Sequence, residues 1–270
     1  MTAGTNGDGT NTTNTGLTSV TKVCAPATIV IAPLIAAAWL PPTFLIGLRQ
    51  ILLSVWGVGA ILVSERLLFS PTLGEALRAV GFVQARTSTL VVAVLVSLPM
   101  WAFLPAFAWT RGASIALRPE WLYLLVGVVL VNGITEEVIH RGFVFGHLRR
   151  VRSFAAAATL SAMVFAAQHL YIIATTGWTV GLASVILAAL LAYPLAFVFE
   201  RGGKSIIAPA ILHTSSNAPV VVLAVPEDIA AVALVPHMGV VLLSLYLVFA
   251  FRKVSLAGIT SASGGHDGRR

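Results

Sequence analysis

The sequence has few charged residues and a single cysteine. Only 10% of its 270 residues are Asp, Glu, Lys or Arg, whereas 57% are hydrophobic. A soluble domain carries roughly 25% charged residues, so the composition excludes a soluble globular protein and indicates a membrane protein. Because Cys24 has no second cysteine to pair with, an intramolecular disulfide and a metal cage built from cysteines are both excluded.

Most of the sequence consists of long apolar runs with few charged residues. Most are close to the ~20 residues that cross a bilayer as a helix, and they do not alternate as the strands of a β-barrel would. We therefore predict an all-α fold, a polytopic transmembrane helix bundle. Prolines interrupt the first run, so seven spans are the alternative to eight. The predicted spans are 23–40, 43–63, 88–109, 121–145, 153–175, 178–199, 205–224 and 231–251.

The segments between and beyond the spans are expected to lie outside the hydrocarbon. Residues 1–22 are rich in Thr, Asn and Gly and predict a disordered tail, and residues 255–270 predict a second, flexible tail. The stretch 64–87 mixes charged residues with leucines and valines, which predicts an amphipathic segment at the membrane interface. The rest divides into N-terminal membrane helices with this interfacial segment (23–119), a core (120–225) and a last membrane helix (226–254).

The positive charges fall mostly on one side of the predicted bundle. With eight spans, nearly all Lys and Arg residues outside the spans share one side, and only Arg111 and Arg118 fall on the other. The positive-inside rule then predicts an integral protein of the cell membrane with both termini cytoplasmic. The net charge of +7 would suggest nucleic acid in a soluble protein. Here we expect the bilayer, with its anionic lipids, to be the partner and no nucleic acid.

Polar clusters interrupt three of the apolar segments. Segment 135–141 places two glutamates and an arginine inside a predicted span, and segments 165–169 and 213–217 each place a histidine in another. Charged groups cost several kcal/mol in hydrocarbon, and where they occur they usually mark a functional site. We therefore expect three helices to assemble one polar site inside the bundle.

Helical geometry predicts how segment 135–141 divides its charges. At about 100° per residue, Glu137 and Arg141 lie on one face and are spaced for an ion pair. Glu136 points elsewhere and is expected to face a cavity, where His140, one turn later, can hydrogen-bond to it. Phe165 shares a face with the histidine of its own segment and is expected to pack in the core.

The three polar segments are not predicted to lie at one depth. Counted inward from the loops predicted to be cytoplasmic, Glu136 and His213 each lie roughly nine residues deep, about 13–15 Å at 1.5 Å per residue. His169 lies about 17 residues from Arg152, which is too deep unless its helix begins outside the hydrocarbon or is strongly tilted.

A carboxylate beside two imidazoles and a carboxamide has the groups that hydrolysis requires. Glu136 can take a proton from water, and a histidine and Asn217 can stabilise the oxyanion that forms on a carbonyl. Alternatively, Glu136, His169 and His213 can hold a divalent metal such as zinc, which activates water. The His-Glu-x-x-His motif of soluble zinc proteases is absent. Whether a metal takes part stays open.

Two further functions fit the same buried charges. One is a proton-coupled transporter, in which Glu136 and the histidines relay protons. The sequence shows neither an inverted repeat nor a pair of broken helices, which counts against it. The other is a non-catalytic membrane scaffold or immunity protein, in which the charges fix helix packing.

At these residues the chain resembles the type II CAAX prenyl endopeptidases, also called CPBP or Abi intramembrane proteases. The resemblance covers about residues 120–225. His140 departs from the bulky apolar residue that is usual in the family at this position. The family's pattern is Glu-Glu-x-x-x-Arg, Phe-x-x-x-His and His-x-x-x-Asn on separate membrane helices, and the chain has Glu136-Glu137-x-x-x-Arg141, Phe165-x-x-x-His169 and His213-x-x-x-Asn217 in the same order.

The resemblance implies an intramembrane endopeptidase with a catalytic core at 120–225. It implies that Glu136 activates water and that His169, His213 and Asn217 complete the site, with Glu137 and Arg141 in support. The expected substrate is a membrane-associated protein or peptide, and prenylated CAAX-type proteins are the family's namesake. We expect the active site to open to the cytoplasmic side.

Overall fold

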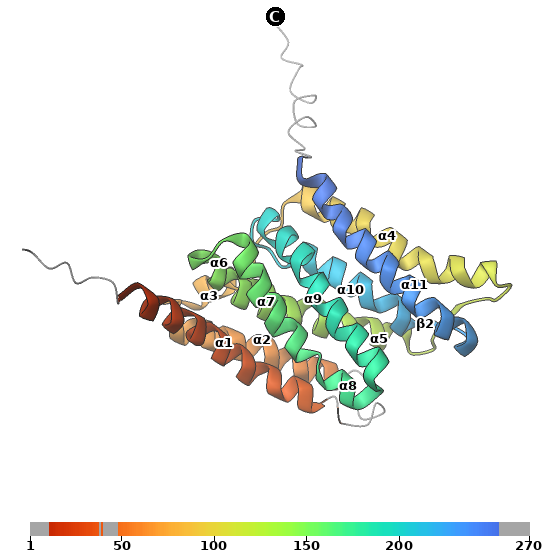
Figure 1. Ribbon diagram of the computed structural model, residues 1–270, viewed down its shortest axis with the longest axis horizontal. Helices are drawn as coiled ribbons and strands as arrows, with labels where there is room; N and C mark the ends of the chain where they lie inside the picture. The colour runs from red at the N-terminus through yellow and green to blue at the C-terminus, as the bar shows by residue number, and fades with distance from the viewer. Residues whose placement is uncertain (1–10, 38, 40–47, 254–270) are drawn as a thin grey trace, which may run out of the picture.

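The structure of the protein is a computed structural model that describes residues 11–37, 39 and 48–253. In this part of the chain, six helices are long and apolar enough to cross a membrane, and a shorter apolar helix covers Val20–Ala36. Figure 1 shows the helices packed side by side, with α1 and α2 on one flank and α4 and α11 on the other. The predicted all-α, polytopic membrane bundle is confirmed.

The elements follow one another with short connections. Four of them, α5, η1, η2 and α6, form one long helix over 121–151, and α7 and α8 form the next span over 154–176. The bounds are α1 (Asn11–Ala37), α2 (Leu48–Leu68), α3 (Leu73–Ala79), α4 (Thr87–Thr110), β1 (Ala116–Leu117), α5 (Trp121–Val128), η1 (Val129–Thr135), η2 (Val138–Phe145), α6 (Gly146–Val151), α7 (Phe154–Gln168), α8 (Tyr171–Thr176), α9 (Trp178–Arg201), α10 (Ile207–Val222), β2 (Leu223–Ala224), α11 (Glu227–Tyr246) and η3 (Leu247–Lys253).

Each predicted span corresponds to a helix, but two of these helices are shorter than a full span. The apolar part of α1 covers Val20–Ala36. Helix α10 has 16 residues, because the predicted span 205–224 carries the polar segment 213–217 and begins after a turn. The described residues therefore contain six helices long enough to span, one shorter apolar helix and the 16-residue α10, in place of the eight predicted spans.

The segments predicted to lie outside the spans are also shorter. Helix α1 begins at Asn11, inside the predicted tail 1–22, because helical hydrogen bonds continue outward from its apolar stretch. Helix α2 runs on to Leu68, so the predicted interfacial stretch 64–87 contains only the short helix α3 between two connections. The predicted tail 255–270 lies outside the described residues.

The two ends of the bundle differ in charge. At one end, Arg149 of α6 donates two hydrogen bonds to Glu200 of α9, and the Arg86 backbone N–H before α4 donates to the Gly202 carbonyl after α9. Further cations lie on the helix ends and connections here, so we call this the cation-rich end; they are Arg66, Arg78, Arg86, Arg150, Arg152, Arg201 and Lys204. At the opposite end, β1 and β2 pair antiparallel and join the start of α5 to the end of α10. Figure 1 labels α6 and α9 of the first end and β2 of the second.

Two glycines let the long helix 121–151 approach its neighbours closely. A Cβ atom at Gly142 would overlap the backbone carbonyl of Val80, and one at Gly133 would overlap the side chain of Thr214 on α10. The first contact fixes the helix against α3, and the second brings η1 against α10. The polar residues between these two glycines are thereby placed next to the histidine of α10.

Candidate active site

Two π-helical segments flank the pair Glu136-Glu137. Segment η1 ends at Thr135 and η2 begins at Val138, so the two glutamates lie between two wide turns. The Glu136 backbone N–H donates to the carbonyl of Val131, five residues earlier, as in a π-helix. π-Helical turns are rare, and they occur frequently at functional sites.

Glu137 connects two cationic or basic partners. Its Oε1 atom lies 3.0 Å from a guanidinium nitrogen of Arg141 and 2.7 Å from Nδ1 of His213. The predicted Glu137–Arg141 ion pair is confirmed. The guanidinium also lies over the ring of Phe165, 4.7 Å from its centre. All three polar side chains are almost completely buried, so they neutralise one another away from water.

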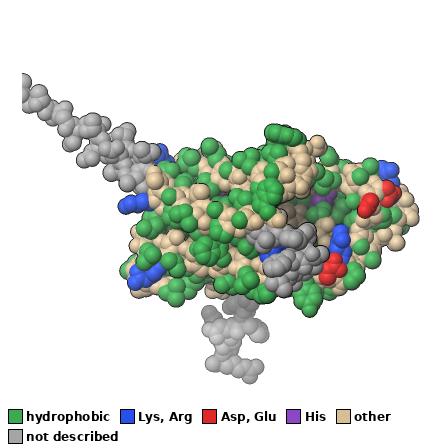
Figure 2. Space-filling view, turned by 90° about the horizontal axis from the view of Figure 1, so that it is seen from below, with side chains coloured by type: hydrophobic (Ala, Val, Ile, Leu, Met, Phe, Trp, Pro, Cys, Tyr) green, Lys and Arg blue, Asp and Glu red, His purple; other side chains and the backbone are tan. Residues whose placement is uncertain are grey.

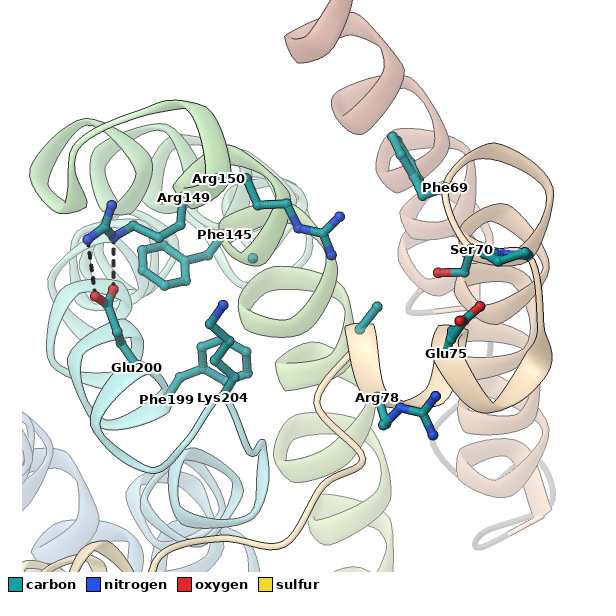
Figure 3. A pocket seen from close by; sticks show the side chains of 13 residues that line it. Phe69, Ser70, Glu75, Arg78, Phe145, Arg149, Arg150, Phe199, Glu200 and Lys204 are labelled. Atoms are coloured by element: carbon teal, nitrogen blue, oxygen red, sulfur yellow. Dashed lines mark hydrogen bonds and ion pairs between the residues drawn. The ribbon is translucent and has the colours of Figure 1, made fainter.

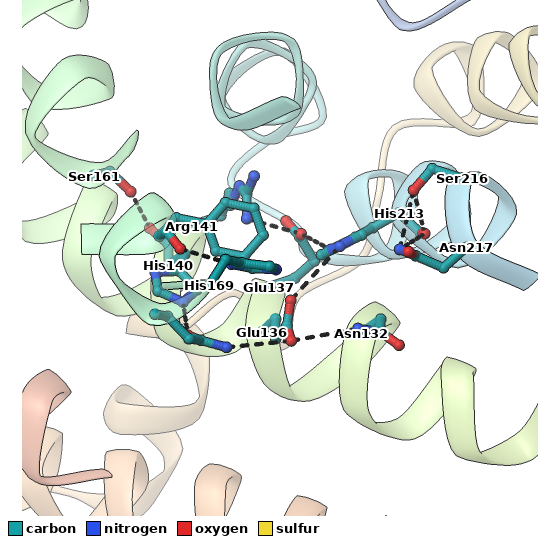
Figure 4. A network of polar contacts seen from close by, with 12 residues as sticks. Asn132, Glu136, Glu137, His140, Arg141, Ser161, His169, His213, Ser216 and Asn217 are labelled. Atoms are coloured by element: carbon teal, nitrogen blue, oxygen red, sulfur yellow. Dashed lines mark hydrogen bonds and ion pairs between the residues drawn. The ribbon is translucent and has the colours of Figure 1, made fainter. Parts of the chain in front are cut away.

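The two carboxylate oxygens of Glu136 differ in their hydrogen bonding. Its Oε1 atom accepts hydrogen bonds from the amide groups of Asn132 and Gln168, both at 3.3 Å. Its Oε2 atom has no hydrogen-bond partner among the described residues, and Nε2 of His213 lies 3.6 Å away. Figure 4 shows the carboxylate between Asn132 and His213. Glu136 is 5% exposed, so this oxygen is held in a nearly enclosed space.

His140 forms its side-chain hydrogen bond with Gln168 and not, as predicted, with Glu136. Its Nε2 atom lies 2.7 Å from Oε1 of Gln168, and the amide nitrogen of the same Gln168 donates to Glu136. Gln168 of α7 therefore stands between the two side chains. The ring of His140 also packs against Phe165 at 4.6 Å between centres.

His169 lies at the depth of Glu136, and the predicted mismatch disappears. The long helix continues to Val151 rather than ending at Phe145, so Glu136 lies 15 residues before the end of that helix. His169 lies 15 residues after Phe154, where the antiparallel α7 begins. Nδ1 of His169 lies 2.8 Å from the Phe165 carbonyl, and Nε2 has no hydrogen bond to any described residue.

Asn217 is held by its own helix. Its amide nitrogen donates to the carbonyl of His213 at 3.1 Å and to the hydroxyl of Ser216 at 3.2 Å. The same His213 carbonyl accepts a hydrogen bond from Ser216. The side chain thus reaches the wall of the Glu136 cavity, with its N–H groups turned to the backbone of α10.

Two cavities meet at Glu136. The first, of about 190 Å³, lies between α7, α8, α9 and α10, and the second, of about 260 Å³, lies between α1, α2 and α5. Figure 2 shows a hollow in one face of the bundle with a histidine visible inside it. The residues lining the first include Glu136, Phe165, Gln168, His169, Tyr171, His213 and Asn217, and those lining the second include Leu34, Arg49, Leu124, Asn132, Glu136, Tyr171 and Val221.

Both cavities extend from Glu136 away from the cation-rich end. The long helix contributes to them only residues up to Glu136, and α2 contributes only its first residues, beginning with Arg49. Helix α10 contributes His213 and residues after it. The site therefore opens toward the end at which β1 and β2 pair, which differs from the predicted opening at the arginine-rich loops.

Part of the sequence matches a known protein family, and the matched part contains the polar cluster. Residues 118–219, which include every polar side chain of the cluster, match the family described as Type II CAAX prenyl endopeptidase Rce1-like. These residues are an Rce1-like CAAX endopeptidase domain. Membership in this family implies an intramembrane peptidase. No curated protein matches the sequence.

The contacts of His213 and His169 in this Rce1-like domain bear on the metal alternative. Among the described residues, no group of three His, Cys, Asp or Glu side chains is arranged to hold a metal ion. His213 points one ring nitrogen at Glu137, and His169 points one at its own backbone. Both contacts use Nδ1 and leave Nε2 of each ring available, so whether Glu136, His169 and His213 bind a metal stays open.

Three features of the Rce1-like site were not predicted from the sequence. Asn132 and Gln168 both bind Glu136, and Glu137 binds His213. Asn132 lies one turn before Glu136, which is a usable signal because residues four apart share a helix face. Gln168 lies directly before a motif histidine, but only the packing of α7 on the long helix brings it to Glu136.

Proposed function

We propose that the protein hydrolyses peptide bonds of membrane-associated proteins or peptides with a water molecule that Glu136 activates. The observation that carries this proposal is the Oε2 atom of Glu136. It has no hydrogen-bond partner in the described part of the chain, it lies next to a cavity, and two amides hold the other oxygen of the same carboxylate. A carboxylate fixed in this way can accept a proton from water at a defined position.

His213 is placed to handle the proton that Glu136 takes. Glu137 accepts a hydrogen bond from Nδ1–H, so the Nε2 atom of the neutral ring carries the lone pair and faces Glu136 at 3.6 Å. A carboxylate that fixes the tautomer of a histidine in this way is a recurring feature of hydrolase sites. We assign to His213 the transfer of the proton to the leaving amine, and to Glu137 and Arg141 the positioning of His213.

His169 and Asn217 line the wall opposite the long helix and are proposed to bind the oxyanion. The Nε2 atom of His169 has no hydrogen-bond partner among the described residues and donates a hydrogen bond when the ring is protonated. Asn217 donates to its own helix in the present geometry, so its part requires a rotation of the amide group about Cβ–Cγ. Hydrogen-bond donors placed at a developing oxyanion contribute about 10²–10³ in kcat each.

The experiment that tests the proposed function measures cleavage of a peptide library by the purified protein. The library should contain quenched fluorescent peptides with and without a prenylated C-terminal cysteine, presented in detergent and in vesicles. We expect cleavage by the wild type and loss of at least about 100-fold in the His213→Ala variant. If the variant cleaves as fast as the wild type, or if neither cleaves any member, the proposal is wrong.

We further propose that the cation-rich end is cytoplasmic, because positive charge concentrates on that side in membrane proteins. Helix α1 reaches the Glu136 cavity with Leu34, near its end, and the residues beyond Tyr246 pack on the start of α4, so both described termini lie at the cation-rich end. Both termini would then be cytoplasmic. The active site would open toward the opposite, extracytoplasmic side, from which the substrate would enter.

Cysteine labelling of intact cells tests this orientation. In a Cys24→Ser background, Thr176→Cys places a thiol at the opening end, and the matched Arg152→Cys places one at the cation-rich end; both positions are exposed. We expect a membrane-impermeant maleimide to label Thr176→Cys in intact cells and Arg152→Cys only after lysis. The reverse pattern would place the cation-rich end outside the cell.

The transporter and scaffold alternatives have no observation of their own in the structure. A proton relay needs a path across the bundle, whereas the two cavities at Glu136 extend toward the same end. A purely structural role does not explain why Oε2 of Glu136 is buried without a hydrogen-bond partner among the described residues, because such burial costs free energy of folding.

A further inference from the structure

A second pocket, outside the cavities at Glu136, lies at the cation-rich end. It has a volume of about 440 Å³ and is formed by the connection after α2, helix α3, helix α6, the end of α9 and the connection that follows α9. Figure 3 shows its charged and aromatic side chains. The lining includes Phe69, Ser70, Glu75, Arg78, Phe145, Arg149, Arg150, Phe199, Glu200 and Lys204.

Four cations and two carboxylates line this pocket, and their pairing is incomplete. Arg149 binds Glu200 with two hydrogen bonds, and the Glu75 carboxylate accepts one from the hydroxyl of Thr72. Among the described residues, the remaining three cations have no carboxylate within ion-pair distance; they are Arg78, Arg150 and Lys204. They come from three separate segments of the chain and face one pocket.

The backbone of Lys204 adopts a conformation that a lysine rarely takes. Its φ is +63°, and it follows Gly203 with φ of +83°. Left-handed backbone is unfavourable for a residue with a Cβ and, where it persists, often marks a functional site. The surrounding connection is held by the bond from Lys204 N–H to the Phe199 carbonyl and by the bond from Ile206 N–H to the Gly81 carbonyl. The backbone of Lys204 is thereby fixed, and its side chain lines the pocket (Figure 3).

The surroundings of the pocket match the boundary between a bilayer and water. Leu67, Leu68 and Leu73 lie within two residues of lining residues in the sequence and have exposed side chains, as hydrocarbon contacts of a membrane helix would. The pocket itself is polar and carries a net positive charge at the end where the loop arginines gather. Basic pockets of this kind between membrane helices bind anionic headgroups.

We propose that this pocket binds a phosphate group, with Arg78, Arg150 and Lys204 as its ligands and the headgroup of an anionic phospholipid as its carrier. Guanidinium groups bind phosphate oxygens through paired N–H donors, and an ammonium adds a point charge. The exposed leucines would contact the acyl chains. The proposal is independent of the peptidase activity, because no ligand of this pocket lines the cavities at Glu136.

Thermal unfolding of the purified protein in neutral detergent tests the site. The probes are phosphatidylglycerol, phosphatidylcholine and water-soluble glycerol phosphate. The test variant is Arg78→Gln/Arg150→Gln, and the matched control is Arg111→Gln/Arg118→Gln, which removes the same charge from exposed positions at the opposite end. Lys204→Gly removes the third cation and relieves the left-handed backbone, so this variant is expected to fold at least as well as the wild type.

We expect phosphatidylglycerol to raise the unfolding temperature of the wild type and the control, and to bind about tenfold or more weakly to the test variant and to Lys204→Gly. If glycerol phosphate stabilises the wild type as strongly as phosphatidylglycerol does, the pocket recognises the phosphate alone. The assignment of a phospholipid as the carrier of the phosphate is then wrong. If phosphatidylcholine stabilises the protein as much as phosphatidylglycerol does, or if the control loses as much affinity as the test variant, the proposed phosphate site is wrong.

Discussion

Replacing Glu136 by glutamine is expected to lower kcat for peptide cleavage by about 10²–10⁴, the usual contribution of a general base. Glutamine keeps the shape of the side chain and one oxygen for Asn132 and Gln168, so the cavity should be retained. It cannot accept a proton from water at the position of Oε2. KM should change little, because the lost interaction belongs to the transition state.

The measurement is steady-state cleavage of a peptide identified in the library, with Glu227→Gln as the matched control. Glu227 is an exposed glutamate in the first turn of α11 and lines neither cavity at Glu136. The control should keep the activity of the wild type. A Glu136→Gln variant that retains more than about a tenth of the wild-type kcat would remove Glu136 from the role of base.

Replacing Arg141 by methionine is expected to destabilise the protein by about 3–5 kcal/mol, the cost of leaving one member of a buried ion pair without its partner. Arg141 is 1% exposed and Glu137 is completely buried. Without the guanidinium, Glu137 would keep only His213 as a hydrogen-bonded partner. The stacking of Arg141 over Phe165 would be lost as well. The measurement is the unfolding free energy in mixed micelles.

Arg149→Met is the matched control, because the Arg149–Glu200 pair is about one-third exposed and should contribute about 0–1 kcal/mol. The double variant Glu137→Gln/Arg141→Met removes both charges and should regain part of the stability lost in Arg141→Met, since no unpaired charge is then buried. If Arg141→Met is as stable as Arg149→Met, the buried Glu137–Arg141 pair does not contribute to the unfolding free energy.

The apolar runs predicted the bundle because hydrocarbon imposes one requirement on every spanning helix, namely apolar length. The same local reasoning predicted the Glu137–Arg141 pair, since both residues lie on one helix. It failed for His140, whose partner Gln168 comes from another helix. It also failed for the lengths of α1 and α10, because apolar composition does not specify where a helix begins in the bilayer.

The direction of the cavities could not be predicted from the sequence either. The depth of Glu136 depends on where the long helix ends, and that helix continues through six more residues of α6. The π-helical turns beside Glu136 have no recognised signature in the residues that form them. The phosphate pocket depends on contacts between α3, α6 and the connection after α9, which are far apart in the chain.

The buried side chains around Glu137 have a net charge that one proton can neutralise. Two glutamates and one arginine leave it with one negative charge, and a single proton held between Glu136 and His213 makes it neutral. Passing that proton from one group to the other changes no net charge in a region where an added charge is costly. The bundle can therefore carry an acid–base cycle in its interior while its total charge stays constant.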